Sequence, residues 1–326
     1  MEEVRARRAP FAAEVSLLLL LATLWGASYS FIKLGVATIP PITLIAARTL
    51  IAGMLLLMLM RWRGVKVPKD IATWRRFAFQ ACLNSVFPWT LLAWGERWVD
   101  AGLATILSSA TPIFTFLFTA LITRHEAANP RKLFGVIVGM AGICLVIGLG
   151  ALDHVGQELL AEIAITTAAM CYACGAIFGR GFKGLDPMAP AAGSLICGTA
   201  ILIPLSLAFE QPWTLVPSAR SMLALLGLAV FSTAAALVIY FRLIQTLGSV
   251  ATTAQSYLRV PIGVALSVAL VGETLTPTVG IGLACVVLGA AAMTIPPPGG
   301  GAEKLLTNLL AGWRTVIRGT NTAGKL

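Results

Sequence analysis

Two stretches of this chain carry polar side chains at helical spacing within apolar surroundings. Their shared offsets are i, i+3, i+4 and i+7, and the residues are Thr105, Ser108, Ser109 and Pro112, then Thr252, Gln255, Ser256 and Arg259. Residues at this spacing share one face of a helix. Because hydroxyl, amide and guanidinium groups can hold a polar solute, we expect both faces to line a central cavity. The alternative is that these groups hydrogen-bond neighbouring helices.

Arg259 carries the chemistry most specific to a ligand. A guanidinium at membrane depth costs at least about 2.5–3.5 kcal/mol on insertion scales, and it can hold a carboxylate or phosphate through two parallel hydrogen bonds. We therefore predict that Arg259 binds an anionic group of a substrate. Two alternatives are a position near the outer end of its helix and a pairing with a neighbouring acid or carbonyl. Arg48 raises the same question.

A third polar face is predicted near residue 84. Gln80, Asn84 and Pro88 are spaced four apart, so they share one side of a helix. Pro88 lacks an N–H group and is expected to kink that helix. We expect Gln80 and Asn84 to contribute to the cavity, and the alternative is an amide contact between helices.

Three aromatic residues lie deep in apolar segments and are expected to bound the cavity. Together with Arg259 they indicate an amphiphilic substrate with a flat or apolar part and a charged end, and an amino acid fits that description. The predicted substrate-binding set is Trp25, Gln80, Asn84, Ser108, Ser109, Tyr172, Gln255, Ser256, Tyr257 and Arg259.

No group of residues in the sequence predicts catalysis. The stretch HEAANPRKLFG begins like a zinc-protease signature, but Asn129 stands where the second metal-binding histidine is required. His125 and His154 are the only histidines, and the Cys171-x-x-Cys174 pair stands alone in an apolar segment, where cysteine packs as a small hydrophobe. No Walker motif is present. We therefore predict no enzyme activity, no metal, no other cofactor and no ATP-driven pump.

The composition identifies the elements that must position these residues. The chain has 326 residues, of which 58% are hydrophobic and 12% charged, and its mean hydropathy is +0.87. A water-soluble protein of this size needs more charged surface. A membrane-spanning helix needs roughly 20 apolar residues. Ten such segments are predicted, near 13–34, 41–61, 74–96, 101–123, 131–150, 158–180, 188–209, 219–246, 249–271 and 277–295.

The chain contains an internal repeat with an offset of 147 residues, the distance from Glu126 to Glu273. At this offset Pro130 falls on Pro277, and the same gap-free alignment holds across about five helices. Further pairs are Gly135 with Gly282, Gly142 with Gly289, Ser109 with Ser256 and Pro40 with Pro187. The sequence therefore predicts a duplicated five-helix unit. Gly135-x-x-x-Gly139 predicts close helix packing.

The basic residues predict that the two units are inverted. The loop after the second span carries six of them, whereas its counterpart after the seventh carries only Arg220. Basic loops are cytoplasmic, so this reversal predicts opposite orientations and places both termini in the cytoplasm. The net charge of +10 is then assigned to loops facing anionic lipid rather than to nucleic acid.

The predicted fold class is thus an all-α membrane protein, with ten transmembrane helices in two inverted five-helix repeats around a central cavity. The first repeat spans 1–150 and the second 151–296. Residues 297–326 form a cytoplasmic tail, in which apolar residues at helical spacing predict an interfacial helix. The alternative is a disordered basic tail.

Glu126 and Glu273 stand at equivalent places, each just before a proline that opens the next span. A carboxylate there can cap the helix that follows, and proline is tolerated in the first turn. We interpret each as a helix-turn contact, and the alternative is a proton-coupling carboxylate.

Several motifs resemble the drug/metabolite transporter superfamily of the EamA type. They are LWGASYSFIKLG from Leu24, AAR from Ala46, Pro112 followed by Glu126, and Pro261 followed by Glu273. The resemblance implies ten helices with five-plus-five pseudo-symmetry, and export of amino acids or other small metabolites across a bacterial inner membrane. It also implies a structural or gating role for Arg48.

The predicted function is secondary export of small metabolites, amino acids first and aromatic or other apolar ones among them, by alternating access. The alternative is a carrier of anionic compounds such as sugar nucleotides or phosphorylated metabolites. The expected partners are a small-molecule substrate and the lipid bilayer. A coupling proton and facilitated diffusion both stay open, as does the oligomeric state.

Overall fold

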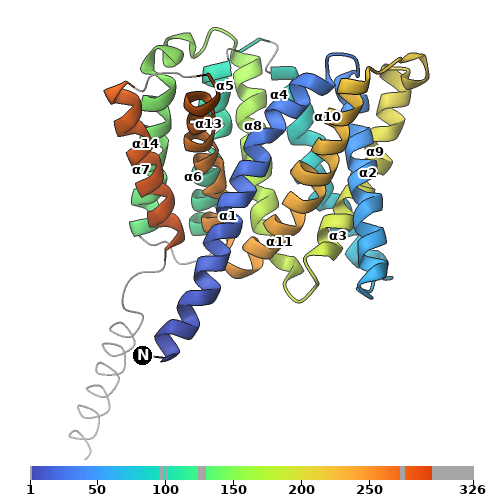
Figure 1. Ribbon diagram of the computed structural model, residues 1–326, viewed down its shortest axis with the longest axis horizontal. Coiled ribbons are helices and arrows are strands. Elements are labelled where there is room, and N and C mark those ends of the chain that lie inside the picture. Colours follow the sequence, from blue (N-terminus) through green and yellow to red (C-terminus); the bar gives the residue numbers. More distant parts are fainter. Residues whose placement is uncertain (1, 96–97, 100, 124–129, 272–275, 296–326) are drawn as a thin grey trace, which may run out of the picture. The chain divides into compact units, whose positions relative to one another are not determined.

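The computed structural model describes residues 2–95, 98–99, 101–123, 130–271 and 276–295, and over these residues it contains helices and turns but no strand. Residues Met1–Thr294 form one compact unit, shown in Figure 1. The second unit, Ile295–Leu326, lies outside the described residues except for Ile295. The predicted interfacial helix, Glu126 and Glu273 therefore fall outside the described part of the chain.

Each predicted span coincides with a helical segment. Six are single helices: α1 (Glu2–Gly35), α2 (Pro41–Trp62), α7 (Pro130–Ile147), α8 (Leu159–Gly179), α9 (Met188–Phe209) and α14 (Pro277–Thr294). Among the described residues, eight segments are long and apolar enough to cross a membrane, and the third and ninth predicted spans are the two outside that set. The prediction of an all-α membrane protein is confirmed.

The other four spans consist of consecutive helical pieces. The third is α3 (Ile71–Ala81), η1 (Cys82–Val86) and α4 (Phe87–Gly95), and the fourth is α5 (Ala101–Ser108), α6 (Thr111–Phe118) and η2 (Thr119–Thr123). The eighth is α10 (Ala219–Ala229), η6 (Val230–Ala235) and α11 (Ala236–Thr246), and the ninth is α12 (Ser249–Thr253) and α13 (Gln255–Val271). Short 3₁₀ turns, η3 (Leu149–His154), η4 (Arg180–Phe182) and η5 (Pro212–Thr214), lie in connections.

Two of these pieces, η1 and η6, are π-helical turns at equivalent places in the two halves. In η1 the Phe87 N–H bonds to the Cys82 carbonyl, five residues back. Pro88 follows directly and cannot donate the next backbone bond, which explains the irregular turn. In η6 the Thr233 hydroxyl donates to the Leu228 carbonyl at 2.8 Å, so a side chain satisfies a backbone group that the turn leaves free.

Equivalent helices of the two halves run antiparallel where they meet. Along α2 and α9, the Thr43 and Ser206 hydroxyls are 2.7 Å apart, whereas Gly53 packs against Ile196 ten residues further along α2. Helices α7 and α14 meet through glycines: a Cβ at Gly142 would lie 2.6 Å from the Gly282 carbonyl oxygen, and one at Gly135 would lie 2.6 Å from that of Gly289. Only glycine permits this approach of two backbones.

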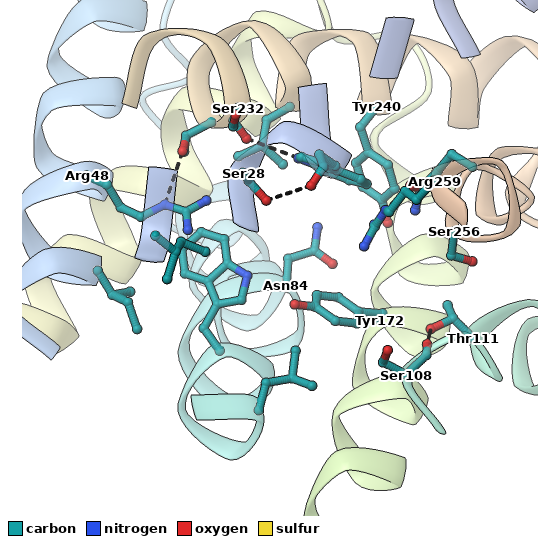
Figure 2. Close-up of a pocket in the computed structure, with 18 of the residues that line it drawn as sticks. Ser28, Arg48, Asn84, Ser108, Thr111, Tyr172, Ser232, Tyr240, Ser256 and Arg259 are labelled. Carbon is teal, nitrogen blue, oxygen red and sulfur yellow. Dashed lines mark hydrogen bonds between the residues drawn. The ribbon is translucent and has the colours of Figure 1, made fainter. Parts of the chain in front are cut away.

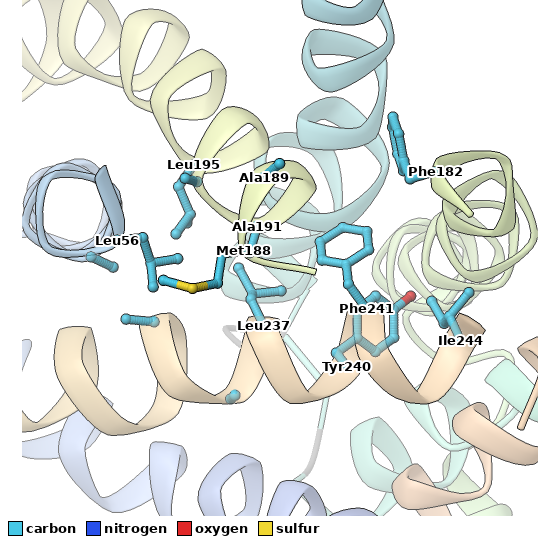
Figure 3. Packing of buried hydrophobic residues seen from close by; sticks show 14 of the residues in the cluster. Leu56, Phe182, Met188, Ala189, Ala191, Leu195, Leu237, Tyr240, Phe241 and Ile244 are labelled. Atoms are coloured by element: carbon cyan, nitrogen blue, oxygen red, sulfur yellow. The ribbon is translucent and has the colours of Figure 1, made fainter. Parts of the chain in front are cut away.

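The largest buried cluster closes one end of the bundle. It gathers side chains from the C-terminal half of α2, from α3, η4 and α11, and from the start of α9. Figure 3 shows Leu56, Phe182, Met188 and Phe241 among them. These segments adjoin the α2–α3 loop, which holds the basic run from Arg61 to Arg76. We call this the basic-loop end. The opposite end carries the turn between α1 and α2.

Candidate functional site

A cavity of about 330 Å³ lies inside the helical unit, and both halves line it (Figure 2). Its walls come from α1, α2, η1, α4, α5, α6, α8, η6, α11, α12 and α13. Equivalent positions of the two halves contribute, since Trp25 pairs with Tyr172 and Ser108 with Gln255 at the offset of 147. Val36 and Pro41, at the turn between α1 and α2, also line it. The cavity therefore extends toward the end opposite the basic-loop end.

The structure brings seven of the ten predicted site residues to this cavity. They are Trp25, Asn84, Ser108, Tyr172, Gln255, Ser256 and Arg259. Their binding of a substrate stays a prediction.

The other three predicted residues lie outside the cavity lining. Gln80 is fully buried and its amide donates to the Gly175 carbonyl at 3.1 Å, which is the amide contact between helices weighed as the alternative. Ser109 is buried at the end of α5. Tyr257 is fully buried, and its hydroxyl donates to the Val136 carbonyl at 3.0 Å beside α7.

Arg259 is positioned by residues from its own helix and from α1. Its Nε donates to the Gln255 side-chain oxygen at 2.8 Å, one turn earlier in α13. Its guanidinium lies 5.1 Å from the centre of the Trp25 ring, a distance at which a cation is attracted by the ring face. Trp25 is held in turn, because its indole N–H donates to the Ser232 carbonyl at 3.1 Å.

Arg48 is a second cation on the cavity wall that the predicted site set lacked. Its side chain is buried, its Nε donates to the Thr233 hydroxyl at 3.1 Å, and its guanidinium lies 4.0 Å from the centre of the Trp89 ring. The sequence places Arg48 as an unexplained charge within a predicted span, but the family resemblance implied a structural or gating role for it. One signal was available in the sequence. Thr233, the partner of Arg48, follows Ser232, and Ser232 aligns with Ser85 at the 147-residue offset, so a polar residue occurs at this position in both halves.

The cavity has an uncompensated positive charge. Among the described residues that line it are two arginines and no aspartate or glutamate. Each arginine has a neutral hydrogen-bond partner and an aromatic neighbour, and no described carboxylate forms an ion pair with either. Since two unneutralised guanidinium groups at membrane depth are costly, the arrangement favours an anionic group on a bound molecule.

The lining hydroxyls present oxygen acceptors to the cavity. Ser28 donates its proton to the Trp25 carbonyl at 2.6 Å, Thr111 to that of Ser108 at 3.0 Å, and Ser256 to that of Thr253 at 2.7 Å. A hydroxyl that donates to the backbone still has lone pairs to offer. The cavity thus combines strong donors on two arginines with acceptors on several helices.

A family model described as the EamA-like transporter family matches the chain twice, over residues 12–148 and 159–295. The two matches begin 147 residues apart, which is the offset of the internal repeat. The duplication predicted from the sequence is therefore confirmed.

Curated relatives include an uncharacterized inner membrane transporter, YedA of Escherichia coli strain K12, which is 29% identical over 84% of this chain and 88% of its own length. An uncharacterized transporter of Archaeoglobus fulgidus is 27% identical over 74% of this chain and 83% of its own. Protein PagO of Salmonella typhimurium is 26% identical over 71% and 76%. 

A solved crystal structure shares the fold, with a TM-score of 0.75 and 18% identity over 87% of this chain and 98% of that one. The duplicated match covers the helices that build the cavity and most of the chain. This multi-pass membrane protein therefore belongs to the EamA-like transporter family.

Proposed function

We propose that this transporter exports small metabolites, amino acids first, across a bacterial inner membrane by alternating access. The observation that carries the proposal is the cavity between the halves, where arginine donors and hydroxyl acceptors face one space. A zwitterion needs both: its carboxylate suits a guanidinium, and its ammonium suits oxygen acceptors and aromatic rings. The aromatic walls formed by Trp25, Trp89, Tyr172 and Tyr240 suit a flat or apolar side chain.

The antiparallel pairing of α2 with α9 and of α7 with α14 supports an inverted arrangement of the two repeats. In an inverted pair each half can take the other's conformation, so inward and outward states have similar energies. Positive charge on the loop after α2 supports a cytoplasmic basic-loop end and cytoplasmic termini. On that assignment the cavity described above is open toward the outside.

The inner-membrane location rests on the relative from Escherichia coli, which is named an inner membrane transporter. The topology is tested by single cysteines placed in the Arg61–Arg76 loop and near Thr38. A membrane-impermeant maleimide added to intact cells should label the second and spare the first. The reverse pattern would contradict the proposed orientation.

Counterflow into liposomes tests the function. Proteoliposomes loaded with an unlabelled amino-acid mixture should accumulate labelled amino acids from outside, and Gln255→Ala or Arg259→Ala should abolish the accumulation while the protein stays inserted. Normal kinetics in both variants would refute the assignment of these residues. Comparing counterflow with and without a pH gradient decides between proton coupling and facilitated diffusion.

A second candidate is a carrier of phosphorylated or other anionic compounds, and Arg48 is the observation that favours it. Such a carrier needs more than one cation at its site, and Arg48 supplies a second on the cavity wall in addition to Arg259. Counterflow with phosphorylated sugars in place of amino acids separates the two candidates.

A further inference from the structure

The two cavity arginines occupy separate stations. Arg48 comes from α2 and is held by Thr233 and Trp89, whereas Arg259 comes from α13 and is held by Gln255 and Trp25. The two stations share no hydrogen-bond partner and no aromatic ring. In Figure 2 the two arginines lie on opposite sides of Asn84, and both side chains face the cavity.

Each station leaves donors free for a ligand. The only described bond of Arg48 and of Arg259 uses Nε, so the two Nη groups of each have no hydrogen-bond partner among the described residues. None of these four Nη groups is a fully buried atom without a partner, so each is accessible from outside the protein interior. A guanidinium presents a fork of N–H donors suited to a carboxylate. Each station can therefore take one anionic group.

From this geometry we infer that the site selects substrates with two separate anionic groups, one held at Arg48 and the other at Arg259. The class is a small dicarboxylate. An amino-dicarboxylic acid fits best, because the hydroxyl oxygens of Ser28, Thr111 and Ser256, which come from both halves, line the same cavity and can accept from its ammonium group. The inference rests on the proposed function and names its substrate class. A single phosphate held by both arginines would require the two stations to converge, which their separate partners oppose.

The test uses the purified full chain in nanodiscs and a chain-length series. Binding of succinate, glutarate, adipate and pimelate is measured by calorimetry beside monocarboxylates of the same length. We expect one dicarboxylate to bind at least about tenfold more tightly than its monocarboxylate, since a second charge-assisted contact contributes that much. Glutamate or aspartate should exceed glutamine or asparagine by a similar factor.

Variants locate the two stations. Arg48→Gln and Arg259→Gln should each reduce the preferred dicarboxylate to the affinity of a monocarboxylate, whereas Arg220→Gln, which removes an exposed charge outside the cavity, should leave binding unchanged. Arg48→Lys and Arg259→Lys keep the charge and should retain part of the dicarboxylate preference.

Two results would overturn the inference. One is equal affinity for dicarboxylates and monocarboxylates in the unmutated protein, a measurement that depends on no variant's folding. The other is inorganic phosphate that competes as well as the best dicarboxylate and loses affinity in both arginine variants. If neutral amino acids still show counterflow in either case, the proposed export function stands and only the dianion inference fails.

Discussion

Two equivalent contacts between the halves use opposite chemistry. At the basic-loop end, α1 meets α11 through a polar cluster: the Glu14 carboxylate accepts from Arg242 Nη2 at 2.8 Å and from the Thr246 hydroxyl at 3.0 Å. We call Glu14, Arg242 and Thr246 the polar latch. It lies beside the buried cluster that closes this end.

At the equivalent place, α8 meets α4 without any charge. The 147-residue offset maps Glu14 onto Ala161, Arg242 onto Gly95 and Thr246 onto Val99. Ala161 and Val99 belong to one buried apolar cluster, and a Cβ at Gly95 would lie 3.1 Å from the Ala161 carbonyl oxygen. We call these three residues the dry contact.

The difference shows that, of two equivalent contacts between the halves, one can be held by charge and the other by backbone packing. Water can replace the hydrogen bonds of the polar latch, because the Arg242 side chain is already 50% exposed. Water offers nothing to the dry contact, whose separation would only expose apolar surface. At the basic-loop end the polar latch is thus a contact that hydrates readily, whereas the apolar cluster beside it is not.

The largest effect is expected from overpacking the dry contact. A Leu at Gly95 would push into Ile165 and the Ala161 backbone, since even a Cβ would lie 2.7 Å from Ile165 Cγ1. Gly95→Leu should lower the stability by about 1–3 kcal/mol, measured as the melting temperature in detergent. Gly280→Leu is the matched control, because nothing lies within 4 Å of a Cβ there. Equal losses in both variants would mean that helix propensity rather than packing dominates.

A smaller effect on stability is expected from the polar latch. Glu14→Gln should cost no more than about 1 kcal/mol, as for other part-exposed ion pairs, but it should favour opening of the basic-loop end. Amide hydrogen exchange in Ala236–Thr246 should speed up in this variant, and the charge swap Glu14→Arg with Arg242→Glu should restore slow exchange. Unchanged exchange in Glu14→Gln would show that the latch does not restrain opening.

Removing one hydrogen bond from the latch gives a still smaller change. Thr246→Val makes this position match Val99 of the dry contact and deletes the bond to Glu14 Oε2. The expected loss is about 0.5 kcal/mol, at the low end for one hydrogen bond, because the added methyl group recovers part of it by packing. A gain in melting temperature would indicate that the dry design is the more stable one at both places.

The smallest effect concerns the N-termini of α3 and α10, which are equivalent helices of the two halves. Equivalent helices begin with Asp70 before α3 and with Ser218 before α10, and each side chain accepts from a backbone N–H three residues on. Hydrogen bonds from the Thr73 side chain and backbone lower the pKa of the Asp70 carboxyl, so this cap is complete above the ordinary aspartate pKa and is lost as pH falls through the lowered value. Acid should loosen α3, seen by hydrogen exchange, and should leave the hydroxyl cap of α10 unaffected. Asp70→Ser should remove the difference.

The sequence predicted the spans well because apolar length and proline set them locally. Pro41, Pro130 and Pro277 each open a helix where the hydropathy pattern places one. The repeat was also visible, because one offset relates both copies. What the sequence could not supply is the rotation of each helix about its axis.

Rotation explains the predicted site residues that lie elsewhere. The fourth span breaks after Ser108 and the ninth breaks at Ala254, so α-helical spacing no longer tells which of two neighbouring residues faces the cavity. Ser108 and Ser256 line it, whereas Ser109 and Tyr257 do not. Tyr257 instead packs on Gly139, where the missing side chain of another helix makes room. A single helix does not encode that pairing.

The π-helical turn η6 has a consequence for how the molecule can be re-engineered. It contains Ser232 and Thr233, which face the cavity, and it precedes Arg242, which forms the latch. A turn with one additional residue rotates everything beyond it by about 100° relative to an uninterrupted α-helix. The backbone therefore sets the rotation of the latch residue Arg242 about the helix axis relative to the cavity residues. Exchanging side chains cannot reset it, whereas deleting one residue within Val230–Ala235 would swing Arg242 away from Glu14.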